Sequence, residues 1–64
     1  MKITYDKQAD ALYIKFHELP VHETEEDKSG AILDYAEDGS IVGIEILNAS
    51  KKIKEHDKVE LQFL

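Results

Sequence analysis

Apolar and polar side chains alternate along most of this chain, with the period of two that is typical of half-buried β-strands. In the first two runs the apolar residues share one face: Ile3 and Tyr5, then Leu12, Ile14 and Phe16. The polar residues between the runs favour a turn, because Asp side chains accept hydrogen bonds from backbone amides just downstream. The pattern predicts a β-hairpin over residues 2–17 with one apolar face.

An acidic segment follows a break at Pro20, which lacks an amide hydrogen and cannot lie in a central strand. Residues 21–27 alternate, but neither of their faces is apolar enough to set a register. We therefore expect an exposed edge strand, whose negative charge protects the edge from pairing with other chains.

Two β-prone runs, residues 31–35 and 41–47, flank a turn at Asp38 and Gly39, where glycine supplies the positive φ of a tight turn. The second run is apolar on both faces, with Val42, Ile44 and Ile46 on one and Ile41, Gly43, Glu45 and Leu47 on the other. Such a strand is central, or is covered on its second face by a helix or a partner chain. Gly43 inside it indicates a bulge or a close backbone approach.

The remaining residues predict a short helix and a last strand. Asn48 and Ser50 are candidate N-caps for about two helical turns over residues 51–56, and residues 59–64 alternate again. We predict one domain over residues 1–64. Its fold is mainly β (α+β at the margin), an antiparallel sheet of five or six strands built from hairpins with one short helix near residues 50–56.

Composition narrows the class of protein. The 64 residues include no Cys, so no disulfide or thiolate zinc site stabilises the small core. The absence of Cys also leads us to expect a cytoplasmic location. No apolar run reaches the roughly 18 residues that cross a bilayer. Eight basic residues, all Lys, face fourteen acidic ones, and the net charge of −6 repels phosphate backbones, which excludes nucleic acid as a partner.

Candidate chemistry is sparse. His17 and His22 stand on either side of Pro20 and match no metal-ligand spacing. Asp34 and Glu45 lie on facing strands, where two close carboxylates could act as general acid and base. The alternatives are that Asp34 bonds to a turn amide and that Glu45 pairs with a Lys. No Ser or Thr has a neighbouring His to activate it, so we predict no catalytic, cofactor or metal site.

Side chains that could contact a partner are easier to identify. Tyrosines on strands can pack a ring while the hydroxyl reaches water, which suits an interface. The candidate interface residues are Tyr13, Tyr35, Ile41 and Leu47.

Several short motifs in order carry a family resemblance: Tyr5-Asp6, residues 9–14 and 24–26, residues 32–35 with Asp38-Gly39, and residues 42–47 with Ala49-Ser50. Over about residues 2–50 the chain resembles the small prokaryotic family catalogued as domain of unknown function 2283. The resemblance brings no catalytic residues. Its repeated positions are candidates for turns or strand pairs: Asp6, Asp10, Asp34, Gly39, Gly43 and Glu45.

Two functions of different classes remain. Some relatives are similar to small proteins encoded beside toxins, so the resemblance implies a non-catalytic, acidic protein-interaction domain, an antitoxin-like partner of a basic toxin. The alternative is a self-associating structural domain, a homodimer, because a second copy can complete a small core and cover a strand that is apolar on both faces.

Overall fold

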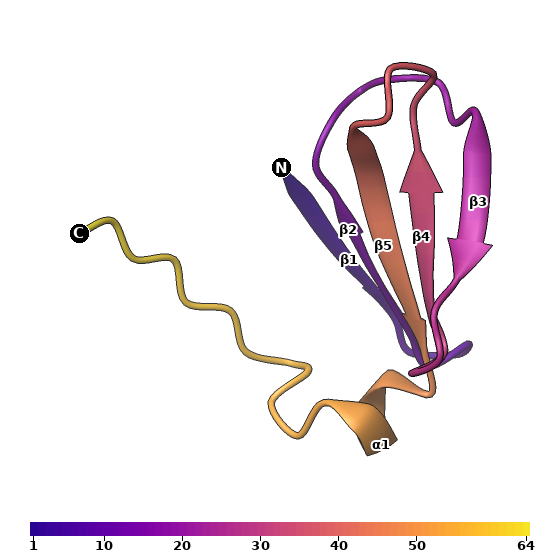
Figure 1. The fold of residues 1–64 in the computed structure, drawn as a ribbon. Helices are drawn as coiled ribbons and strands as arrows, with labels where there is room; N and C mark the ends of the chain where they lie inside the picture. The colour runs from indigo at the N-terminus through magenta and orange to yellow at the C-terminus, as the bar shows by residue number, and fades with distance from the viewer.

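The computed structural model describes residues 1–64 and holds five antiparallel strands in one sheet, followed by one short helix (Figure 1). The elements in chain order are β1 (Lys2–Asp6), β2 (Ala11–Lys15), β3 (Glu23–Glu26), β4 (Ala31–Tyr35), β5 (Ile41–Leu47) and α1 (Ala49–Lys52). The predicted fold class, a mainly β antiparallel sheet with one short helix, is confirmed.

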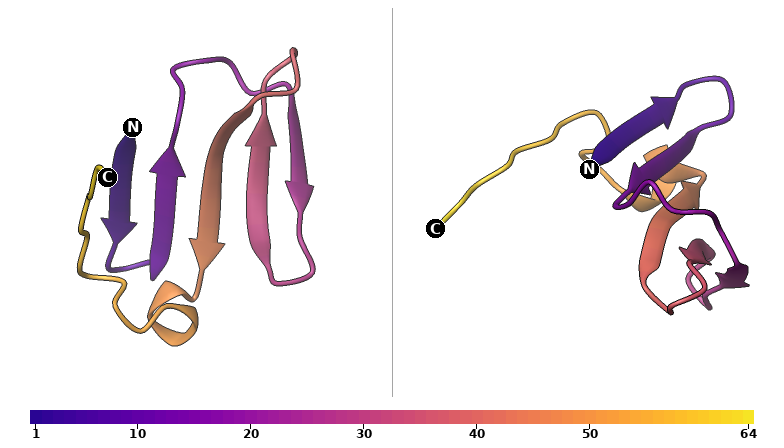
Figure 2. Two further views of the ribbon diagram at one scale, coloured as in Figure 1. Left: turned by 60° about the vertical axis from the view of Figure 1, so that its left-hand side comes forward. Right: turned by 90° about the horizontal axis from the view of Figure 1, so that it is seen from above.

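Strand β5 lies at the centre of the sheet, whose order is β1-β2-β5-β4-β3. It pairs with β2 on one side and with β4 on the other, which confirms the prediction of a central strand. The acidic β3 lies at one edge, as predicted, and β1 lies at the other. Because β3 follows β2 in the chain but pairs with β4, residues 16–22 cross the end of the sheet (Figure 2).

The two-residue period breaks once, in β5. Asp34 pairs with Gly43 but Tyr35 pairs with Ile41, so Val42 is an extra residue that forms a β-bulge. The carbonyl of Val42 accepts two successive amides that follow β2, at 2.7 and 3.3 Å. Directly paired residues point to the same face, so Ile41 lies with Tyr35 and not with Gly43 as simple alternation predicts.

The sheet has two faces of different character, and the pairing assigns residues to each. The face that we call apolar carries Ile3, Tyr5, Leu12, Ile14, Ala31, Leu33, Tyr35, Ile41, Val42, Ile44 and Ile46, with Glu23 and Glu25 at its β3 edge. The face that we call polar carries Lys2, Thr4, Tyr13, Lys15, Thr24, Glu26, Ile32, Asp34, Gly43, Glu45 and Leu47. Apolar groups thus gather on one side of the sheet.

The sheet is a single layer. The buried residues are Leu12, Ala36, Val42, Gly43 and Ala49. Ile14 and Ile44 lie at the middle of the apolar face yet are only half-buried, because no second layer of secondary structure packs on them. The short α1 lies beyond one end of the strands (Figure 1).

The C-terminal segment differs from its prediction. The helix is one turn at Ala49–Lys52, because Ile53 continues in an extended conformation (φ −123°, ψ 109°). Residues 59–64, which we call the arm, pair with no strand, so the prediction of a last strand there is wrong. The arm runs away from the sheet in Figure 1 and in the view from above in Figure 2.

Candidate functional site

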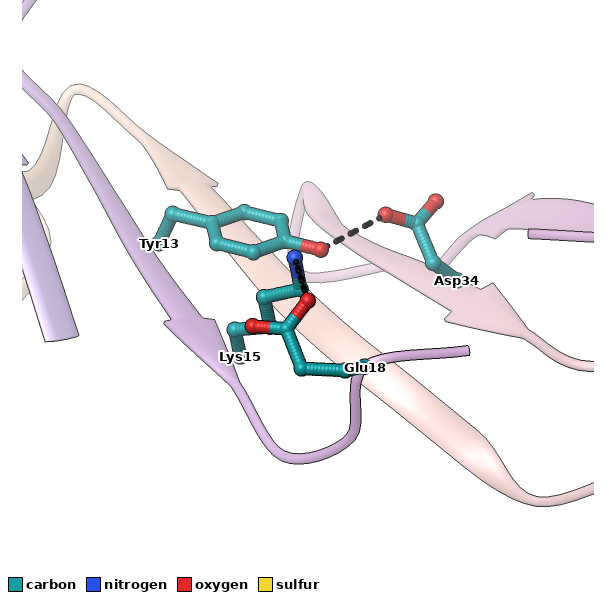
Figure 3. A network of polar contacts seen from close by, with 4 residues as sticks. All are labelled: Tyr13, Lys15, Glu18 and Asp34. Carbon is teal, nitrogen blue, oxygen red and sulfur yellow. Dashed lines mark hydrogen bonds and ion pairs between the residues drawn. The ribbon is translucent and has the colours of Figure 1, made fainter. Parts of the chain in front are cut away.

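A row of hydrogen bonds crosses the polar face. The Tyr13 hydroxyl on β2 donates to Oδ2 of Asp34 on β4 at 3.2 Å (Figure 3), and the Thr24 hydroxyl on β3 donates to Oδ1 at 2.8 Å. Both oxygens of the Asp34 carboxylate therefore have a donor. This arrangement restrains Asp34 and links strands across most of the sheet.

Gly43 on β5 makes the crossing possible, because it pairs with Asp34 and leaves room for the side chain of Tyr13, its diagonal neighbour on β2. A Cβ atom on Gly43 would lie 2.7 Å from Cζ of Tyr13 and 2.8 Å from the backbone oxygen of Ile14. The close approach predicted at Gly43 is therefore present, and the tyrosine side chain occupies the space that any other residue type would need.

Burial raises the pKa of Tyr13, and the hydrogen bond to the Asp34 carboxylate raises it further. The phenol is therefore protonated at neutral pH and acts as a donor. Beside it, Lys15 Nζ lies 2.9 Å from Oε2 of Glu18 and lowers the pKa of that carboxyl (Figure 3). The ion pair is open to solvent, so it adds little to stability.

Glu45 lies on the same polar face, where the sheet register places it opposite Tyr13 and Ile32. Asp34 is therefore its diagonal neighbour across the β4–β5 pair, and the structure gives the two carboxylates no shared hydrogen bond. The only ion pair in the chain joins Lys15 and Glu18, so the Lys partner considered for Glu45 is not found.

The Asp10 carboxylate, between β1 and β2, holds the start of α1 against the end of the sheet. It accepts the Tyr5 hydroxyl at 2.7 Å and both the amide (3.0 Å) and the hydroxyl (2.7 Å) of Ser50. These hydrogen bonds lower the pKa of Asp10 and raise the pKa of Tyr5. Asp10 has a positive φ of 52° and caps α1 from 40 positions away, whereas the side chain of Asn48 makes no cap.

His56 packs on Tyr5, with 4.8 Å between the ring centroids. Its Nδ1 atom is buried and has no hydrogen-bond partner. Together with the Asp10 contacts, this packing holds the chain after α1 on the apolar side of β1, which places the start of the arm.

A groove of about 240 Å³ separates the apolar face from that part of the chain. Ile3, Leu12 and Ile14 line one wall, and Ile53 and Val59 are on the other. The groove adjoins the half-buried side chains of β5 and β4 on the same face. This uncovered apolar surface is the candidate binding site, and Glu55, His56, Lys58 and Glu60 also line its groove.

The structure does not bring the four candidate interface residues together. Tyr35 and Ile41 are paired on the apolar face, whereas Tyr13 and Leu47 lie on the polar face. Tyr13 is a hydrogen-bond donor within the sheet, so its hydroxyl is already engaged.

The remaining turn candidates lie in the β1–β2 and β4–β5 turns. Oδ1 of Asp6 accepts the amides of Gln8 and Ala9 at 3.0 and 3.2 Å. Gly39 has a φ of 88°, which agrees with the positive value predicted for its turn.

Sequence reasoning missed the contact of Asp10 with Ser50 and the role of Thr24. Each contact joins distant positions, and a side chain that caps a helix from outside it leaves no local spacing to recognise. The one available signal was the Asp at position 10, whose short side chain favours caps and positive φ.

No group of three or more His, Cys, Asp or Glu side chains is placed so that it could hold a metal ion. No helix in the structure combines the length and the apolar character that crossing a membrane requires.

One family model matches the chain over residues 2–50, that of a protein of unknown function (DUF2283). The matched segment contains all five strands together with Asp10 and Ser50, and it ends before the arm. No curated protein and no solved structure shows a significant match. Because the family model covers most of its length, the chain belongs to the DUF2283 family.

Proposed function

We propose that this chain is a non-catalytic protein-interaction domain that binds its partner with the apolar face. The observation that carries the proposal is the uncovered single-layer sheet, in which Ile14 and Ile44 are only half-buried at the middle of the fold. Covering apolar surface contributes roughly 25 cal/mol per Å², so a protein seated on this face gains affinity from it.

The total exposed area supports this proposal. The chain exposes 5341 Å², whereas a folded monomer of 7.3 kDa exposes about 4,200 Å². The excess of about 1,100 Å² is larger than the roughly 800 Å² that each partner buries in a standard protein interface. The exposed side chains of the arm, among them Leu61, Phe63 and Leu64, contribute to this excess.

The polar face supports a role without catalysis. Both carboxylate oxygens of Asp34 accept hydrogen bonds, one from Tyr13 and one from Thr24, and these contacts link strands of the sheet. A general base needs a free oxygen directed at a substrate proton. Asp34 is therefore a structural residue in this proposal.

The charge supports a basic partner. A net charge of −6 attracts a positively charged protein at long range and speeds their encounter. An antitoxin-like domain that covers a basic toxin fits this charge, and the lack of Cys fits a reducing cytoplasm. The alternative occupant is a second copy of the chain, which the self-complementary apolar face favours.

The test compares Ile3→Lys with Leu47→Lys, because these residues are 41% and 40% exposed on opposite faces. Circular dichroism checks that each full-length variant folds. Light scattering then measures association, alone and with a purified basic protein. We expect Ile3→Lys to weaken association at least tenfold and Leu47→Lys to change it less than twofold. Equal losses in both variants, or no association of the unmodified chain, would refute the proposal.

A further inference from the structure

We infer that β1 pairs with β1 of a second copy of this chain, antiparallel and centred on Thr4, so that two sheets join edge to edge into one continuous sheet. This pairing uses the edge of the sheet and leaves the apolar face free, so it goes beyond the proposed function. Three observations carry it: the direction of the unpaired backbone groups, the charge of the two edges, and the order of the residues in β1.

The outer edge of β1 has backbone groups without partners. The amide of Phe16 donates to the carbonyl of Val42 at 2.7 Å, so the even-numbered residues of β2 face β5 and the odd-numbered ones face β1. Their partners in β1 are its even-numbered residues. The amides and carbonyls of Ile3 and Tyr5 are therefore directed away from the sheet, where they can pair with a further strand.

The chain after α1 does not fill this edge. Ile53 and Val59 line the groove on the apolar side of β1, and the arm runs away from the sheet in the view from above in Figure 2. No strand lies outside β1 in the sheet order β1-β2-β5-β4-β3. A free edge pairs readily with another chain unless charge or a bulge protects it.

The other edge of the sheet is protected by charge, whereas this edge is not. The four residues of β3 include Glu23, Glu25 and Glu26, so two β3 strands side by side would bring like charges close together. The five residues of β1 include one Lys and one Asp, and their charges cancel. Pairing between edges of two copies therefore favours β1.

The order of the residues in β1 is self-complementary. In the register centred on Thr4, Lys2 lies opposite the partner's Asp6. Ile3 lies opposite the partner's Tyr5, and the outward backbone groups of these two residues then face one another, as a hydrogen-bonded antiparallel pair requires. Pairs of opposite charge and aromatic-aliphatic pairs both stabilise neighbouring strands. Two-fold symmetry repeats each of them.

Both charged side chains of β1 are available for this pairing. Lys2 forms no ion pair in one copy, and its neighbour across the β1–β2 pair is Lys15, whose charge Glu18 already neutralises. Asp6 accepts the turn amides with Oδ1 alone, and its Oδ2 has no partner. Alternation places Lys2 and Asp6 on the polar face, so the sheet separates them from the charged residues that line the groove.

Sedimentation equilibrium of the full-length chain tests the pairing. Lys2→Glu places a carboxylate opposite the partner's Asp6, and circular dichroism checks that the variant folds. Lys28→Glu is the matched control, because it makes the same change of charge in the exposed turn between β3 and β4. We expect a dimer for the unmodified chain, at least fivefold weaker association for Lys2→Glu, and a change of less than twofold for Lys28→Glu.

A mixture of two variants tests the register. Asp6→Lys places two Lys opposite one another, so it should also weaken the dimer at least fivefold. An equimolar mixture of Lys2→Glu and Asp6→Lys should form a heterodimer within twofold of the unmodified dimer. In that heterodimer every contact between positions 2 and 6 joins opposite charges.

Hydrogen exchange measured by NMR reports on the backbone without any substitution. The amides of Ile3 and Tyr5 should be protected at high concentration and lose their protection on dilution. The amide of Thr24 is the control and should stay unprotected. The Asp27 amide donates to the carbonyl of Ala31, so the odd-numbered residues of β3 face β4 and Thr24 faces outward.

Four results would overturn the inference. They are a chain that is monomeric at every concentration, equal effects of Lys2→Glu and Lys28→Glu, a mixture without rescue, and unprotected amides at Ile3 and Tyr5. None of these results contradicts the proposed function, which is tested separately by association with a basic protein through the apolar face.

Discussion

The two faces of the sheet are built from the same five strands but are completed in different ways. On the polar face, Tyr13, Asp34 and Thr24 satisfy one another, and Gly43 leaves room for the tyrosine. On the apolar face, Ile14 and Ile44 are only half-buried, because no second layer of strands or helices covers them. The difference shows that a single sheet can satisfy the polar groups of one face by hydrogen bonds. Burying the side chains of an apolar face requires a second layer.

Of the changes on the polar face, substitution of Gly43 should lower the free energy of unfolding most. Gly43→Ala places a methyl group against Tyr13 and the backbone of β2, so we expect a loss of about 2–3 kcal/mol in the free energy of unfolding. Urea titration followed by circular dichroism measures it. Gly39→Ala is the control, because its Cβ meets nothing within 4 Å and only its positive φ is strained, at about 1 kcal/mol. Equal losses would show that the tyrosine crossing is unimportant.

Removal of one hydroxyl should have a smaller effect on the same face. Tyr13→Phe deletes the donor to Asp34 and should lower the free energy of unfolding by about 1 kcal/mol. Tyr35→Phe on the apolar face is the matched change, since no side-chain hydrogen bond of Tyr35 is present, and it should have almost no effect. A larger loss from Tyr35 than from Tyr13 would reverse our assignment of the two faces.

Acid should weaken the attachment of the C-terminal segment. The hydrogen bonds from Tyr5 and Ser50 lower the pKa of Asp10 in the folded chain below its unfolded value of about 3.9. Their contribution to stability is therefore complete above that pH and is lost as the pH falls through the folded pKa. Thermal unfolding between pH 6 and pH 2.5 should show a steeper acid loss for the unmodified chain than for Asp10→Asn. Parallel curves would contradict this role.

The smallest effect is expected from the ion pair of Lys15 and Glu18. Glu18 is well exposed, so solvent screens the pair and ordering two side chains offsets its attraction. Lys15→Met should leave the melting temperature unchanged within error in differential scanning calorimetry. A clear decrease would mean that this pair, and not the row through Asp34, organises the polar face.

The five strands of the sheet could be predicted, because alternation is a local signal. The central position of β5 could also be predicted, because this strand is apolar on both faces. Gly43 indicated a bulge or a close approach in β5, but the sequence did not show that Val42 is the extra residue or that Ile41 therefore moves to the other face. The cap of α1 by Asp10 joins residues 40 positions apart and has no local signature. The arm was predicted as a strand because it alternates, but a strand also needs an edge to pair with.

The most direct test is solvent accessibility of isoleucine methyl groups, measured by NMR with a soluble paramagnetic agent across a dilution series. Ile14 and Ile44 report on the apolar face, and Ile32 reports on the polar face. We predict that Ile14 and Ile44 are shielded at high concentration and become accessible on dilution, while Ile32 does not change. Methyl groups of Ile14 and Ile44 that stay accessible at every concentration and with a basic protein present would contradict the proposal that a protein covers this face.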